Sequence, residues 1–159
     1  MQNKFLIFLD IDGVLYDWDF ILSQNKKSGI IQTFNPKSVE ALNYFIHKLS
    51  KDYNVEVVIT SSWRKNMVKT LNVLKENKIC ADIKISSTKI TSTPQFRGKE
   101  ILAFLKNNPC KKFVIIDDET FDYHKYFNEN QIIKTNIFNK SLNKEMINNY
   151  FDKTLNLEF

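Results

Sequence analysis

Short runs of apolar residues alternate along this chain with segments in which apolar residues recur every three or four positions. The first run, residues 5–9, is uninterrupted, as expected for a strand that is covered on both faces. Further runs of strand length occupy residues 55–59, 83–85, 113–116 and 132–138. Helical spacing is found in residues 36–49, 67–74, 101–105 and 142–150. This alternation predicts an α/β fold, a three-layer, Rossmann-like sandwich with a mainly parallel, five-stranded sheet.

Two of the helical segments carry end signals. Asn35 and Pro36 supply an N-cap and a proline at the first helical position of residues 36–49. Asn107, Asn108 and Pro109 close the helix that contains residues 101–105. The start of one helix and the end of another are therefore predicted closely.

The chain has the size and composition of one globular domain. Of its 159 residues, 43% are hydrophobic and 26% are charged. No internal repeat or flexible linker divides it, so residues 1–159 are predicted to form a single domain. No apolar run is long enough to span a bilayer, and the first run leads into Asp10 and Asp12 rather than a signal-peptide cleavage site. We therefore expect a cytoplasmic protein that does not associate with membranes.

The cysteines and the net charge add little to this prediction of a single cytoplasmic domain. Cys80 and Cys110 do not have the spacing of metal ligands, and two cysteines are too few for a disulfide framework. They are predicted to be buried, reduced thiols. The formal charge of +5 comes mainly from scattered lysines, so it favours anionic substrates only weakly.

Polar residues whose side chains can bind ligands or take part in catalysis follow three of the predicted strands. They are Asp10, Asp12 and Gly13 after the first strand, Thr60, Ser61 and Ser62 after the second, and Asp117 and Asp118 after the fourth. Arg97 and Lys99 lie just before the third helix. Ligands of such sheets bind at the carboxyl ends of the strands, so these residues should line one cleft. Clustered carboxylates repel one another unless a cation compensates, and oxygen ligands indicate Mg²⁺.

Several of these signals also have purely structural interpretations. Acidic residues next to a glycine often merely end a strand. Asp117 and Asp118 can act as a helix N-cap pair, and Ser61 or Ser62 can cap the helix that follows. The order of the motifs along the chain and their place at strand ends favour a functional site over these alternatives.

For three further residues the sequence leaves the functional role less certain to assign. Arg97 and Lys99 are alternative phosphate-binding cations, with Arg97 favoured, and the choice between them stays open. Trp63 is expected to pack against the protein rather than to stack on a ligand.

In these motifs the sequence resembles the haloacid dehalogenase (HAD) superfamily over nearly its whole length. The matching segments are residues 8–14 with Asp-x-Asp-Gly, residues 57–60 ending in Thr60, the basic Arg97, and residues 115–118 followed by Asp122. Residues 60–64, together with Arg97 and Glu100, are similar to a small subgroup. That subgroup occurs alone and as a module of multi-domain RNA-repair proteins.

The resemblance implies a role for each residue of the first three motifs. Asp10 is the nucleophile that attacks phosphorus, and Asp12 is the general acid and base. Thr60, with Ser61, binds the phosphoryl oxygens, and Arg97 neutralises their charge. Phosphoryl transfer depends mostly on such positioning and charge neutralisation.

The resemblance also implies a bound metal. Mg²⁺ is expected on the side chains of Asp10 and Asp118 and on the backbone carbonyl of Asp12, with Asp117 assisting. Gly13 permits the tight turn that lets the backbone near Asp12 approach a ligand.

The spacing of the motifs bears on the substrate. The segment between Gly13 and Asn35 is too short for the folded cap domain that many family members carry, so we expect an open site. Residues 16–20 fall where the family has a mobile flap. An open site favours a nucleotide or a nucleic-acid phosphate end as substrate, with a phosphoprotein as the alternative. The rival hypothesis is a non-catalytic binding module of the same fold.

Overall fold

The structure is a computed structural model that describes residues 3–24, 29–79, 82–91 and 94–155. Five parallel strands form one sheet in the order β3-β2-β1-β4-β5. The strands are β1 (Lys4–Leu9), β2 (Asn54–Ile59), β3 (Lys84–Ser87), β4 (Lys112–Asp117) and β5 (Ile132–Lys134). The predicted α/β class with a parallel five-stranded sheet is confirmed.

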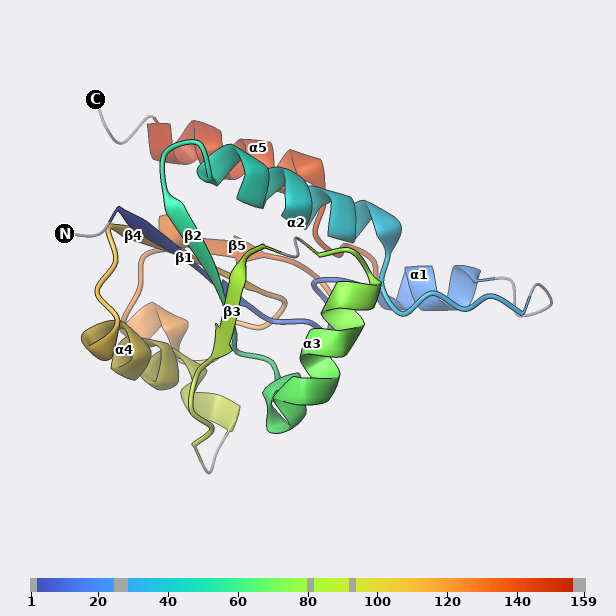
Figure 1. Ribbon diagram of the computed structural model, residues 1–159, viewed down its shortest axis with the longest axis horizontal. Coiled ribbons are helices and arrows are strands. Elements are labelled where there is room, and N and C mark those ends of the chain that lie inside the picture. The colour runs from blue at the N-terminus through green and yellow to red at the C-terminus, as the bar shows by residue number, and fades with distance from the viewer. Residues whose placement is uncertain (1–2, 25–28, 80–81, 92–93, 156–159) are drawn as a thin grey trace.

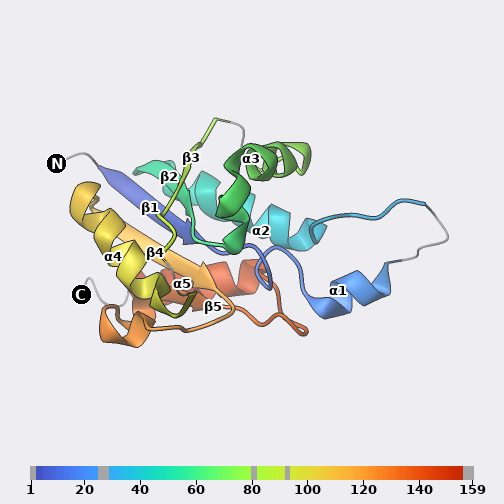
Figure 2. The same ribbon diagram turned by 90° about the horizontal axis from the view of Figure 1, so that it is seen from below.

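Helices cover both faces of the sheet (Figure 1). They are α1 (Trp18–Ser23), α2 (Pro36–Leu49), α3 (Met67–Glu76), α4 (Arg97–Asn107) and α5 (Lys144–Leu155). The α2 and α5 helices lie together on one face and α4 lies on the other, whereas α1 projects away from the sheet (Figures 1 and 2). Among the described residues that separate β1 from α2, no folded cap domain is present, as predicted.

The alternation of side chains along β1 creates two cores. Phe5, Ile7 and Leu9 point into the larger core, which α2 and α5 cover. Leu6 and Phe8 point into the smaller core beneath α4. Both sets are buried, which explains why the first strand is an unbroken apolar run in the sequence.

The predicted helix ends agree with the structure. Asn35 caps α2 by accepting a hydrogen bond from the Lys37 amide at 3.1 Å, and Pro36 is the first residue of the helix. The α4 helix ends at Asn107 with Asn108 as its C-cap. Residues that form these ends interact with their own chain neighbours, so a local signal suffices.

Two predicted strands had the wrong extent. The third strand spans Lys84–Ser87 rather than residues 83–85. The fifth ends at Lys134 rather than at residue 138. The Thr135 amide still donates to the Asp117 carbonyl, but Asn136 then pairs with Lys140 in a separate bridge outside the sheet. An apolar run therefore overstates strand length where the chain leaves the sheet.

The strand order fixes where the site lies. The chain runs outward from β1 through β2 to β3, then crosses back through α4 to β4 on the other side of β1. The crossovers leave β1 and β4 in opposite directions, so a crevice forms between their carboxyl ends. No described helix is both long and apolar enough to cross a membrane.

Candidate active site

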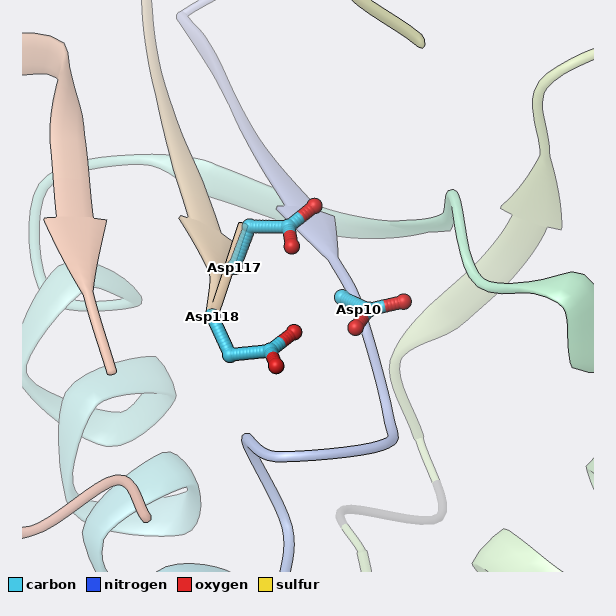
Figure 3. Close-up of side chains that lie close together, drawn as sticks. All are labelled: Asp10, Asp117 and Asp118. Carbon is cyan, nitrogen blue, oxygen red and sulfur yellow. The ribbon is translucent and has the colours of Figure 1, made fainter. Parts of the chain in front are cut away.

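Three carboxylates meet at the ends of β1 and β4. Asp10 follows β1, Asp117 ends β4 and Asp118 is next to it, and an oxygen from each lies within 4.8 Å of the other two. Figure 3 shows the three side chains directed toward the same space between the strands. The Asp10 amide donates to the Ile116 carbonyl at 3.0 Å, which fixes the two strand ends side by side.

Arg97, the first residue of α4, is the cation of this cluster. Its Nη1 atom lies 3.0 Å from Asp10 Oδ1 and 3.0 Å from Asp117 Oδ2. The guanidinium also lies 4.3 Å from the centre of the Phe121 ring, and Tyr123 donates a 2.5 Å hydrogen bond to Asp117 Oδ2. One cation is thereby held rigidly between two carboxylates.

The positive charge of Arg97 does not fully offset the repulsion among the three carboxylates. Burial and the charge of Asp117 raise the pKa of Asp10 well above its usual range. Burial also raises the pKa of Asp117, and burial with the charge of Asp117 raises that of Asp118 to about 6. Burial opposes the charge of Arg97, but Asp117 and Asp10 outweigh it and raise the pKa of the guanidinium. The negative charge of the three carboxylates therefore exceeds the single positive charge of Arg97.

This excess charge and the nature of the donors fit a hard divalent cation. All the converging side-chain atoms are carboxylate oxygens, which Mg²⁺ prefers to nitrogen or sulfur. Asp118 is half-buried, so one side of the cluster remains open to a ligand. Asp10, Asp117 and Asp118 are the residues that would hold the ion, together with the nearby backbone of Asp12.

Two aromatic residues hold the Asp12 carboxylate. Tyr16 donates a hydrogen bond to Asp12 Oδ1 at 2.5 Å, and Trp63 Nε1 donates to the same atom at 3.0 Å. Both bonds go to Oδ1, and no described residue donates a hydrogen bond to Oδ2. The Trp63 ring also packs on Phe34 with centroids 5.8 Å apart, in line with the packing role predicted for it.

The hydroxyls that follow β2 differ in their surroundings. Thr60 is fully buried, and its Oγ1 has no hydrogen-bond partner among the described residues. Ser61 Oγ accepts from the Trp63 amide at 3.3 Å and caps the short helical turn Ser62–Asn66, whereas Asn66 caps α3. Thr60 thus has a donor to offer a ligand, and Ser61 has a structural role that the sequence had left open.

The basic residues at the start of α4 are now distinguished. Arg97 enters the acidic cluster, whereas Lys99 is exposed and its Nζ lies 5.9 Å from the centre of the Phe96 ring. Asp122 accepts hydrogen bonds from the Gly98 and Lys99 amides at 2.6 and 3.3 Å. This cap fixes the first turn of α4 against the β4 loop and so helps to aim Arg97.

A second buried ion pair joins α4 to the loop after β2. Arg64 Nη2 lies 2.6 Å from Glu100 Oε2, and both side chains are over nine-tenths buried. Glu100 Oε1 accepts from the amide and the hydroxyl of Thr91 at 2.6 and 2.8 Å. Glu100 is one helical turn after Arg97, so this network ties α4 to the segments that follow β2 and β3.

Gly13 has no room for a side chain. A Cβ atom built at this position would lie 2.6 Å from Asp118 Cγ, and its φ of +75° disfavours other residues. We expect Gly13→Ala to displace Asp118 and to lower phosphate release by about 100-fold, the typical effect of a misplacement near 1 Å. Strain and the clash should also destabilise the fold by about 1–3 kcal/mol in urea unfolding.

Gly29 supplies the matched control for this substitution. Its φ is +71°, but a Cβ atom there would meet nothing within 4 Å. Gly29→Ala carries a similar backbone strain without the clash, so it should retain activity. Equal activity loss in the two variants would contradict the role given to the contact between Gly13 and Asp118.

Several residues of the site escaped the sequence-based prediction. Tyr123, which holds Asp117, gave no signal, and Tyr16, which holds Asp12, had been noted only within residues 16–20, where the family has a mobile flap. A tyrosine hydroxyl reveals its partner only in three dimensions. Arg64 and Glu100 belonged to the motif of the small subgroup, but their pairing was not foreseen. Of the two cysteines, Cys110 is a half-buried free thiol whose pKa is raised by burial, and Cys80 lies outside the described residues.

Comparison with known protein families places the chain in a family. The family described as "HAD domain in Swiss Army Knife RNA repair proteins" matches residues 6–147. The match begins within β1 and ends in the first turn of α5, so it includes the acidic cluster, Thr60 and Arg97. No curated protein and no solved structure matches the chain.

Proposed function

Because the chain belongs to the family of HAD domains found in Swiss Army Knife RNA repair proteins, we propose that it is a Mg²⁺-dependent phosphatase that acts through an aspartyl-phosphate intermediate. One observation carries the proposal: Asp10, Asp117 and Asp118 converge at the ends of β1 and β4 with Arg97 between two of them. A nucleophile, excess acidic ligands and a fixed cation are what capture of a phosphoryl group requires.

In the first half of the reaction Asp10 is the nucleophile. A carboxylate oxygen of Asp10 forms a bond to phosphorus while the bond from phosphorus to the leaving oxygen breaks. Asp12 gives a proton to that oxygen, which departs as an alcohol. Tyr16 and Trp63 hold Asp12 Oδ1, so Oδ2 is the oxygen oriented for the transfer.

In the second half Asp12 acts as a base. It takes a proton from water, whose oxygen attacks phosphorus as the bond from phosphorus to Asp10 breaks. Inorganic phosphate leaves and both carboxylates return to their starting states. Asp12 therefore ends the cycle protonated, as the first half requires.

The remaining groups bind the phosphoryl oxygens. Arg97 already lies beside Asp10, where it neutralises charge that builds up on the transferred group. The buried Thr60 hydroxyl donates to another of the oxygens, and the Ser61 backbone and hydroxyl lie next in the chain. Asp10, Asp118 and the Asp12 carbonyl, with Asp117 assisting, would hold Mg²⁺, which would supply further neutralisation of the phosphoryl charge.

The proposed substrate class is supported by the family and by the absence of a cap in the described part of the chain. The family occurs in RNA repair proteins, which supports nucleotides or nucleic-acid phosphate ends as substrates. Lys99, exposed on the first turn of α4, is placed to meet the remainder of such an anionic substrate. No specific observation favours a phosphoprotein.

The test is phosphate release from a panel of monoesters. Nucleoside monophosphates, oligonucleotides with a 3′- or 5′-phosphate, phosphopeptides and p-nitrophenyl phosphate are each assayed with Mg²⁺ and with EDTA. We expect turnover with Mg²⁺ only, and best with the nucleic-acid substrates. Absence of turnover on every substrate by folded protein would support the non-catalytic binding module instead.

Metal binding has a readout that does not need turnover. Mg²⁺ that binds the folded state alone should stabilise the protein by about 1.4 kcal/mol at ten times its Kd. In Asp118→Asn this shift should vanish, because a ligand is lost and the excess charge that attracts the ion falls. Thermal unfolding with and without Mg²⁺ measures both effects.

The same variant tests the repulsion within the cluster. In EDTA, Asp118→Asn should be at least as stable as the wild type at neutral pH, since it removes a charge that Asp117 disfavours. Asp52→Asn, which changes an exposed acid at the opposite edge of the sheet, should leave the Mg²⁺ shift intact. An undiminished shift in Asp118→Asn would place the metal elsewhere.

A further inference from the structure

A groove that the mechanism does not use runs along α4. It has a volume of 790 Å³ and lies between this helix and the chain that leaves β3, which is an edge strand of the sheet. Glu100, on one wall, accepts hydrogen bonds from Thr91, on the other. Figure 1 shows α4 and the chain after β3 on the same side of the molecule.

One stripe of α4 and its preceding turn forms a wall of this groove. Phe96, Lys99, Ala103 and Asn107 line it and follow one another at intervals of three or four residues. Phe96 is 43% exposed although it is a large aromatic residue. The wall thus offers an aromatic face at one end, aliphatic surface in the middle and an amide at the other end.

The charge of the groove is positive. Lys89 and Lys99 line opposite walls, and neither ammonium group is paired with a carboxylate within the part of the chain that the structure describes. The one acid in the lining is Glu100, whose oxygens are occupied by Arg64 and Thr91. An anion in the groove therefore meets two cations and an acid that is already neutralised.

One end of the groove is next in the chain to the cation of the proposed phosphate site. Phe96 directly precedes Arg97, whose guanidinium lies against Asp10. From Arg97 to Asn107 the helix rises about 15 Å at 1.5 Å per residue. This length exceeds what one nucleotide occupies, since stacked bases are about 3.4 Å apart along a strand. A ligand that starts at Arg97 has room for several nucleotides.

We infer that this groove binds the nucleotides next to the terminal phosphate of a single-stranded nucleic acid, with a base stacked on Phe96 and backbone phosphates near Lys89 and Lys99. The inference rests on the proposed phosphatase activity and narrows its substrate from nucleotides in general to strand ends. Exposed aromatic residues combined with a basic groove are the usual means of binding single strands without sequence preference.

Binding can be measured apart from catalysis. A fluorescein-labelled, single-stranded RNA of six nucleotides is titrated with protein in EDTA, and its anisotropy is recorded for wild type, Phe96→Ala, Lys89→Ala and the control Lys51→Ala. Phe96 caps α4 without a side-chain hydrogen bond, so its replacement leaves the helix end intact. Lys51 is exposed in the turn before β2, away from the groove.

We expect Phe96→Ala to weaken RNA binding about tenfold, as for loss of one base stack. Lys89→Ala should weaken binding and reduce its salt dependence, because one fewer phosphate contact releases fewer counterions. Lys51→Ala should match the wild type. In the phosphatase assay, the preference for a phosphorylated tetranucleotide over p-nitrophenyl phosphate should fall in Phe96→Ala.

The outcomes separate this inference from the proposed function. If the RNA binds wild type and Phe96→Ala equally, or binds neither, the groove does not hold nucleic acid, even where monoester hydrolysis is intact. If a peptide competes for the groove and RNA does not, the inference is likewise wrong. If RNA binding depends on Phe96 but no monoester is hydrolysed, the inference about the groove is supported and the phosphatase proposal is wrong.

Discussion

Replacement of Asp10 by asparagine is expected to reduce Mg²⁺-dependent phosphate release on the order of 10³-fold or more. The amide cannot form the bond to phosphorus that the proposed mechanism assigns to this carboxylate. Asparagine has nearly the same shape, and its carbonyl oxygen can still accept from Arg97, so the fold should persist. The loss should appear in kcat, measured by phosphate release under saturating substrate.

The control for this prediction is Asp52→Asn. Asp52 is an exposed acid just before β2, at the edge of the sheet opposite the site, and its replacement removes the same formal charge. It should retain wild-type turnover, which excludes a general effect of net charge. If Asp10→Asn kept a rate within tenfold of the wild type, Asp10 would not be the nucleophile.

The largest expected loss of stability comes from Glu100→Ala. Arg64 is 7% exposed, and Glu100 is its only ion-pair partner among the described residues. Burial lowers the pKa of Arg64 while Glu100 opposes that effect, so the cation depends on this one acid. Removal of one partner of a buried pair costs about 3–5 kcal/mol. Urea unfolding should show this decrease in the free energy of unfolding.

An exposed ion pair provides the comparison. Lys144 Nζ lies 2.5 Å from Glu40 Oε1, but the two side chains are 49% and 65% exposed. Glu40→Ala should therefore cost less than about 1 kcal/mol. The double variant Arg64→Leu/Glu100→Leu should recover part of the loss, because removal of both buried charges is often tolerated. If Glu100→Ala lowered the free energy of unfolding as little as Glu40→Ala does, the Arg64 guanidinium would be hydrated rather than dependent on Glu100.

The supporting residues explain how a small, capless domain can hold its reactive groups in place. Aromatic or basic neighbours hold an oxygen of three acids of the site: Tyr16 and Trp63 for Asp12, Tyr123 and Arg97 for Asp117, and Arg97 for Asp10. Such contacts fix the orientation of carboxylates before a substrate arrives, which is the main source of electrostatic stabilisation of a transition state. A separate cap domain is not needed for that task.

The sequence by itself determined the fold class, the family and the motif positions of the site. An uninterrupted apolar run predicts a buried strand, and this held for β1 and β4 because burial on both faces leaves few polar positions. Asn35 and Pro36 marked the start of α2, because caps interact with their own neighbours. These signals are local, so they can be read from the order of residues.

Only the tertiary structure decided which side chains meet. The sequence left Arg97 and Lys99 as alternatives, and the choice depends on the direction in which each side chain leaves the first turn of α4, which Asp122 fixes from a distant loop. The partners Arg64 and Glu100 are 36 residues apart in the sequence. Packing also left Val68 exposed although it fits the apolar stripe of α3. Such contacts arise from the crossing of strands and helices, so no local pattern contains them.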